Sequence, residues 1–122
     1  MKKILIADDE DILRMLIEDT LEDSDLGFEI DEAEDGREAL DKILNGSYDL
    51  VILDYMMPHL TGMEVLEQLR LSSFYIPVLM LTAKAQETDR ERALQNGAEY
   101  FMSKPFSPIE LLNLVESILE TS

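Results

Sequence analysis

The chain has 122 residues, 46% of them hydrophobic, and its 27 acidic and 10 basic residues give a formal net charge of −17. This length fits a single domain, residues 1–122, and excludes an eightfold α/β barrel, while the acidic surface argues against direct nucleic-acid binding by the domain. No apolar run approaches the roughly 20 residues of a membrane span, and the absence of cysteine is compatible with the cytoplasmic location that we expect.

Short aliphatic runs alternate along the chain with segments of helical period. In chain order the predicted strands are Lys3–Ala7, Phe28–Ala33, Leu50–Leu53, Pro77–Leu81 and Glu99–Met102. The apolar positions of the predicted helices lie within 12–21, 39–44, 63–69 and 111–119, and a mostly polar helix is predicted for 85–95. The pattern therefore predicts five strand–helix units in succession.

Cap residues support these helices. Two segments are typical of capping boxes: Asp35-x-x-Glu38 and Ser107-Pro108-x-Glu110. The second has proline at the first helical position. The pairs at 45–46 and 96–97, both Asn-Gly, predict left-handed helix ends.

Strands that alternate with helices form a parallel sheet with helices on both faces. We therefore predict an α/β fold, a doubly wound five-stranded parallel sheet in the flavodoxin-like order 2-1-3-4-5. Sites in such sheets form at the carboxyl ends of the strands. There the sequence places Asp8 and Asp9 after the first strand, Asp54 after the third, Thr82 after the fourth and Lys104 after the fifth.

Each of these residues alone is more often a helix cap or a loop residue, and only their convergence indicates a site. Clustered carboxylates repel one another and need a cation or a shifted pKa. Oxygen ligands without histidine or cysteine favour a hard ion, Mg²⁺ or Mn²⁺. A metal, an ammonium and a hydroxyl around a carboxylate can stabilise a phosphoryl group in transfer, with Asp54 as the nucleophile.

Four segments resemble the receiver domain of bacterial two-component response regulators, including chemotaxis regulators: ILIADDE, DLVILDYMMPHLTGMEVL, VLMLTAKA and GAEYFMSKPF. The resemblance covers essentially the whole chain. It implies that Asp54 accepts a phosphoryl group from a histidine kinase or a histidine phosphotransfer protein. It also implies that Asp8 and Asp9 hold Mg²⁺, Asp9 directly, with Asp54 and the backbone carbonyl of Met56 as further ligands.

The resemblance further implies that Thr82 and Lys104 contact the phosphoryl group and that Lys104–Pro105 is a cis peptide. Thr82 and Phe101 would form the switch, although Phe101 brings no hydroxyl, and Tyr100 should point to the opposite face of its strand. Such a domain is a regulatory phosphoacceptor, not a turnover enzyme, and promotes only its own phosphorylation and dephosphorylation.

Two positions are expected to set the lifetime of the phosphoryl group. They are Met56 and Lys84, each two residues beyond a site residue. Because Met56 cannot orient an attacking water, we expect slow hydrolysis.

The output surface is predicted from the helices. The fourth helix has the thinnest apolar face, and the fifth has a stripe broader than one sheet face needs, formed by Leu111, Leu114, Val115 and Ile118. We therefore expect the fourth helix, fifth strand and fifth helix to contact an output domain or partner, or a second copy in a homodimer.

Two other functions use parts of the same pattern. A phosphatase resembling haloacid dehalogenases usually carries a second Asp two residues after its nucleophile, where this chain has Met56. A flavodoxin-like flavin binder needs hydroxyl and glycine loops after the first strand, where this chain has four acids.

His59, the single histidine, is interpreted as a solvated loop residue in preference to a metal or phosphorelay residue. The sequence leaves open whether the chain is a stand-alone regulator or part of a longer one.

Overall fold

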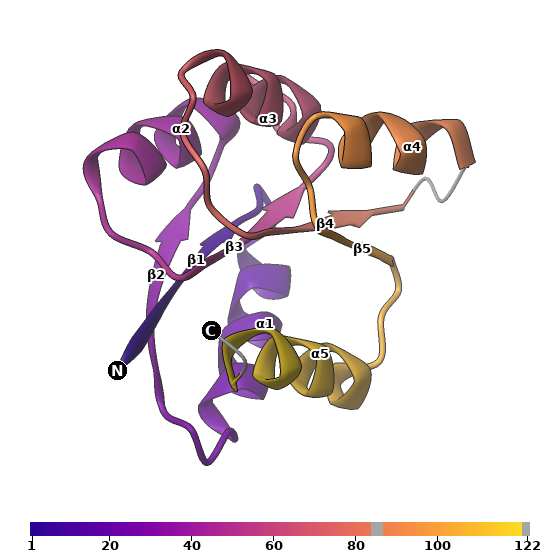
Figure 1. Ribbon diagram of the computed structural model, residues 1–122. Coiled ribbons are helices and arrows are strands. Elements are labelled where there is room, and N and C mark those ends of the chain that lie inside the picture. Colours follow the sequence, from indigo (N-terminus) through magenta and orange to yellow (C-terminus); the bar gives the residue numbers. More distant parts are fainter. Residues whose placement is uncertain (84–86, 121–122) are drawn as a thin grey trace.

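Five parallel strands form one sheet at the centre of the molecule, in the order β2-β1-β3-β4-β5 (Figure 1). The computed structural model describes residues 1–83 and 87–120, and for residues 87–89 it describes the backbone alone. The strands are β1 (Lys2–Ala7), β2 (Phe28–Ala33), β3 (Leu50–Asp54), β4 (Val78–Thr82) and β5 (Tyr100–Ser103). The predicted fold and strand order are confirmed.

A helix follows each strand and covers one face of the sheet or the other. The helices are α1 (Asp11–Glu22), α2 (Gly36–Asn45), α3 (Gly62–Leu71), α4 (Glu87–Gln95) and α5 (Pro108–Glu120). Helices α1 and α5 lie on one face, and α2, α3 and α4 lie on the other (Figure 1). Within the described part of the chain, none of these helices has the length and apolar character to cross a membrane.

The core has two layers, because successive side chains of a strand point to opposite faces. On β1, Leu5 and Ala7 pack toward α2, α3 and α4, whereas Ile4 and Ile6 pack toward α1 and α5. Every residue of β3 and β4 is buried. The unbroken apolar runs of these strands therefore reflect burial on both faces, as expected for central parallel strands.

The helix starts agree in part with the predicted capping boxes. The Asp35 carboxylate accepts from the backbone N–H of Glu38 at 2.8 Å, but the Glu38 carboxylate accepts from the N–H of Glu34 at 2.6 Å. Ser107 Oγ accepts from the N–H of Glu110 at 3.4 Å. A complete box, which the sequence reading missed, starts α3 at Thr61 and Glu64.

One of the two predicted left-handed helix ends is wrong. Gly97 has a φ of +106°, as predicted, but Gly46 has a φ of −111°. A Cβ at position 46 would lie 2.7 Å from the Tyr48 ring and 2.8 Å from the carbonyl oxygen of Lys42. Position 46 therefore needs glycine for space, not for handedness.

Candidate functional site

The predicted site residues gather at the carboxyl edge of the sheet. Asp54 and Thr82 are the last residues of β3 and β4, one residue later than the predicted strand ends, and Asp8 and Lys104 directly follow β1 and β5. Asp8, Asp54 and Thr82 are buried, with exposures of 1%, 4% and 0%. Burial of two carboxylates at one edge is costly without a compensating cation.

The Lys104 ammonium provides one such cation. Its Nζ lies 3.1 Å from Asp8 Oδ2 and 3.0 Å from Asp54 Oδ1. Burial lowers the pKa of Lys104, but the contacts with Asp54 and Asp8 outweigh burial, and the pKa is raised. Lys104 is therefore a fixed positive charge between two buried carboxylates.

Even with Lys104 beside it, Asp54 is a perturbed acid. Burial and the charge of Asp8 raise its pKa from 3.8 to about 6, although Lys104 and the backbone N–H of Met56 act in the opposite direction. A pKa above the ordinary value means that the ionised form is destabilised here. The ionised Asp54 would gain from a second cation or from an electrophile that takes its charge.

The turn after β1 supplies further carboxylates. The N–H of Asp8 donates to the carbonyl of Ala33 at 3.1 Å, and Asp8 Oδ1 accepts from the N–H of Glu10 at 2.8 Å. Among the described residues, Asp8, Asp9 and Glu10 have ligand oxygens within 4.8 Å of one another. Asp54, predicted as a ligand, lies outside this group, whereas Glu10 was not predicted to belong to it. This all-oxygen donor set suits Mg²⁺.

A glycine allows α3 to begin against the end of β3. The N–H of Gly62 donates to the carbonyl of Tyr55 at 2.8 Å, and a Cβ on Gly62 would lie 2.4 Å from the carbonyl oxygen of Asp54. Any larger residue would push the helix away from the strand end. The side chain of Met56, in the loop between them, is 54% exposed.

The end of β4 is joined directly to the segment that carries Lys104. The backbone N–H of Lys104 donates to the carbonyl of Thr82 at 2.8 Å, and the Lys104–Pro105 bond is cis, as predicted. Phe101 packs toward α2, α3 and α4, and Tyr100 packs toward α1 and α5, so the prediction that they face opposite sides is confirmed. Lys84 lies outside the described residues.

Residues 4–116 match the family model of the response regulator receiver domain. The chain belongs to this family. It is 46% identical over 121 residues to the alkaline phosphatase synthesis transcriptional regulatory protein PhoP of Bacillus subtilis, a match that covers 99% of this chain and 50% of that relative. It is 43% identical over 122 residues to the CpxR homolog, a transcriptional regulatory protein of Haemophilus influenzae, with 100% and 52% covered.

Solved structures agree with the receiver assignment. The Francisella response regulator 1452 receiver domain has a TM-score of 0.92 at 32% identity, with 99% of this chain and 98% of that one covered. The response regulator TrrA of Thermotoga maritima, solved with Mg²⁺ and BeF, has a TM-score of 0.83 at 37% identity, with 97% and 99% covered. Phosphorylation-activated switching is the general function of this family. The receiver domain spans about half the length of the curated relatives it matches.

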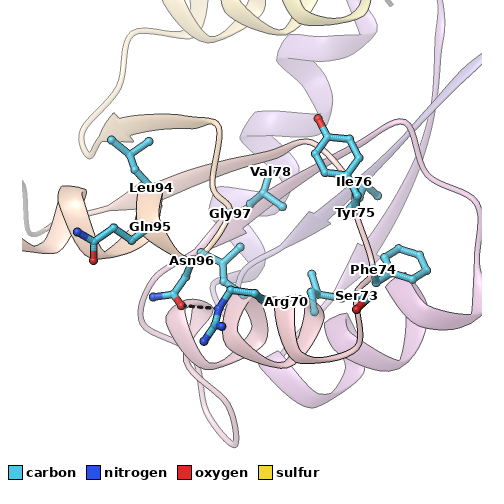
Figure 2. A pocket seen from close by; sticks show the side chains of 12 residues that line it. Arg70, Ser73, Phe74, Tyr75, Ile76, Val78, Leu94, Gln95, Asn96 and Gly97 are labelled. Atoms are coloured by element: carbon cyan, nitrogen blue, oxygen red, sulfur yellow. Dashed lines mark hydrogen bonds between the residues drawn. The ribbon is translucent and has the colours of Figure 1, made fainter.

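Two cavities differ in their relation to the receiver's acidic edge. A cavity of about 340 Å³ lies beside Lys104, with Glu10, Leu13 and Phe106 in its lining. Another, of about 250 Å³, lies at the opposite edge, where β4 begins at Val78 (Figure 2). Its lining is mainly apolar. Two of its polar lining residues are hydrogen-bonded to each other, Arg70 Nε donating to Asn96 Oδ1 at 3.2 Å (Figure 2). The first cavity includes the predicted site residue Lys104 in its lining, and the described lining of the second includes none of the predicted site residues.

Proposed function

We propose that Asp54 is the phosphoacceptor of this receiver domain. The observation that carries the proposal is the Lys104 ammonium held at 3.0 Å from Asp54 and 3.1 Å from Asp8, at a buried strand edge. Lys104 is positioned to balance charge on the phosphoryl group, and Asp54 is a carboxylate nucleophile at the end of a fully buried central strand. Thr82, the last residue of the neighbouring strand, would donate its hydroxyl to a phosphoryl oxygen.

The proposed donor is a phosphohistidine on a histidine kinase or a histidine phosphotransfer protein. A carboxylate oxygen of Asp54 attacks the phosphorus, a P–O bond forms and the P–N bond of the donor breaks. The imidazole leaves with the electron pair of that bond, and Asp54 becomes an acyl phosphate. Hydrolysis by water returns the carboxylate and releases inorganic phosphate, so the domain regulates and does not turn over an external substrate.

We propose that this step needs Mg²⁺, with Mn²⁺ as a substitute. Asp8, Asp9, Asp54 and the backbone carbonyl of Met56 would hold the ion. Glu10, whose carboxylate oxygen lies within 4.8 Å of those of Asp8 and Asp9, would join them. When bound, the ion withdraws charge from the phosphoryl oxygens. The Mg²⁺ and BeF present in the structure of TrrA support this proposal by similarity.

The switch would run from the site to the surface of α4, β5 and α5. Thr82 moves toward the new phosphoryl oxygens, Phe101 turns inward, and α4 shifts. Weak attachment of α4 supports this direction, because Ala93 is the only buried residue among side chains 90–95. The apolar stripe of α5 gives this output surface less support than the sequence predicts. Three of its residues are buried against the sheet and α1: Leu111, Val115 and Ile118.

This surface would act on an output domain, a partner or a second copy of the chain in a homodimer. The matched relatives are named transcriptional regulatory proteins and are about twice as long as the chain, which favours a separate output domain in them. The acidic receiver itself would not bind nucleic acid. Met56 and Lys84 would set the lifetime of the phosphoryl group.

The test is phosphorylation with acetyl phosphate and Mg²⁺, followed by intact-mass measurement. One phosphoryl group should add to the protein, in an acid-labile linkage, and Asp54→Asn should remove the label. Asp41→Asn, the same change at an exposed residue of α2, should leave it intact. Undiminished labelling of Asp54→Asn would sink the assignment, and sustained turnover of a small phosphoester would favour a phosphatase instead.

A further inference from the structure

A buried arginine stands behind the acidic turn. Arg14 is only 6% exposed, although it lies on the second turn of α1. Its Nη1 donates to the carbonyl of Asp8 at 2.6 Å, and its Nε donates to Glu32 Oε1 at 3.1 Å. Its Nη2 contacts the carboxylate of Asp11 and lies 3.6 Å from Glu34 Oε1. One guanidinium thus joins α1, the turn after β1 and the end of β2.

Stability alone does not explain an arginine at this position. Arg14 shares the inward face of α1 with Ile17 and Leu21, at i, i+3 and i+7. An apolar side chain of similar volume would fill such a position without the cost of desolvating a charge, and replacements of that kind are often neutral or stabilising. The distinctive feature of Arg14 is its bond to a backbone carbonyl in the acidic turn.

That carbonyl belongs to the peptide that joins Asp8 to Asp9. The N–H of Asp8 donates to the carbonyl of Ala33, and the carbonyl of Asp8 accepts from Arg14. The peptide groups before and after Asp8 are therefore both held by hydrogen bonds. Asp9 is exposed, and its direction follows from the backbone that precedes it. The planar fork of an arginine can hold this carbonyl and the Glu32 carboxylate together, which a lysine ammonium does less well.

We propose that Arg14 is a positioning residue for the metal site, which orients the Asp8–Asp9 peptide so that both carboxylates face one ion. The inference rests on the proposed Mg²⁺ site but assigns a residue outside the ligand set. Arg14 does not touch the phosphoryl group, and it acts through the turn that it holds.

Calorimetric titration with Mg²⁺ at fixed low ionic strength tests this inference. Arg14→Lys should weaken Mg²⁺ binding about tenfold, the lower end of what loss of an outer-sphere partner costs. Arg14→Met should weaken Mg²⁺ binding at least as much, even though a site that has lost a nearby positive charge would by itself attract the cation more strongly. Arg70→Met is the matched control for charge, since Arg70 is exposed on the last turn of α3, and it should bind Mg²⁺ as tightly as the unmodified chain or slightly more tightly.

A second pair of variants guards against misfolding of the Arg14 variants. Glu32→Ala removes one anchor of the guanidinium, and Glu29→Ala makes the same charge change at an exposed position of β2. Glu32→Ala should weaken Mg²⁺ binding more than Glu29→Ala does. The positioning role would be overturned if Arg14→Met bound Mg²⁺ as tightly as Arg70→Met, and Glu32→Ala as tightly as Glu29→Ala. A lower melting temperature of the Arg14 or Glu32 variants without weaker Mg²⁺ binding would overturn it as well. Loss of Mg²⁺ binding by the unmodified chain would overturn the proposed metal site itself.

Discussion

Replacing Asp54 by asparagine should stabilise the protein at neutral pH in buffer containing EDTA. The pKa of Asp54 is raised from 3.8 to about 6, mainly by burial and then by the charge of Asp8. The folded state therefore binds this proton more tightly than the unfolded chain does. The stability contributed by Asp54 is complete below pH 3.8 and is lost as the pH rises through about 6.

The size of the effect follows from the same values. The difference between about 6 and 3.8, at about 1.4 kcal/mol per pKa unit, is about 3 kcal/mol. Asparagine resembles the neutral acid, so Asp54→Asn should raise the free energy of unfolding by up to about this amount at pH 7.5. At pH 5 the acid is mostly protonated in the folded state and mostly ionised in the unfolded state, and about half of the gain should remain.

Urea unfolding followed by circular dichroism at the two pH values measures both differences. Asp41→Asn, at an exposed site, should change the free energy of unfolding by less than about 0.5 kcal/mol at either pH. Destabilisation by Asp54→Asn at pH 7.5, or a gain that is the same at both pH values, would refute the description of Asp54 as a buried, destabilised carboxylate.

Three further predictions concern the metal, the lifetime and the switch. Mg²⁺ should raise the melting temperature, with about 2.7 kcal/mol of stabilisation at a hundred times its dissociation constant, and Asp9→Asn should weaken that response; a response to sodium chloride alone would indicate only screening. The acyl phosphate of Met56→Asn should decay faster than that of the unmodified chain, because asparagine can orient water, and equal decay rates would contradict this. Beryllofluoride should shift amide resonances of 87–95 and Tyr100–Met102, and Thr82→Ala should abolish those remote shifts; if only residues touching the mimic respond, the surface is not part of the switch.

The strand order could be predicted because the sequence pattern is strong where burial is complete. The continuous apolar residues of β3 and β4 are all buried in the structure, and the alternation of strand and helix leaves few topologies. Strand ends were displaced by one residue at Asp54 and Thr82, because backbone pairing extends past the last apolar side chain. The role of Gly46 could not be predicted, since it depends on where the Tyr48 ring packs.

The site was predictable where single residues end strands, and not where a side chain reaches between elements. Asp8, Asp54 and Lys104 meet as the topology requires. Glu10 and Arg14 were missed, because their contribution depends on the path of the turn after β1 and on the end of β2. Spacing alone does not single out Arg14, because Glu18 shares its helical face; Arg14 is distinguished by being the one charged residue among the buried residues of α1.

The most direct test of the central claim is to locate the phosphoryl group chemically. Treatment with acetyl phosphate and Mg²⁺, reduction with borohydride and peptide mapping by tandem mass spectrometry convert an aspartyl phosphate into homoserine at its own position. The account predicts homoserine at position 54, and a parallel sample without acetyl phosphate should contain none. Homoserine at Asp8 or Asp9, or its absence from a protein that carries the label, would contradict the account.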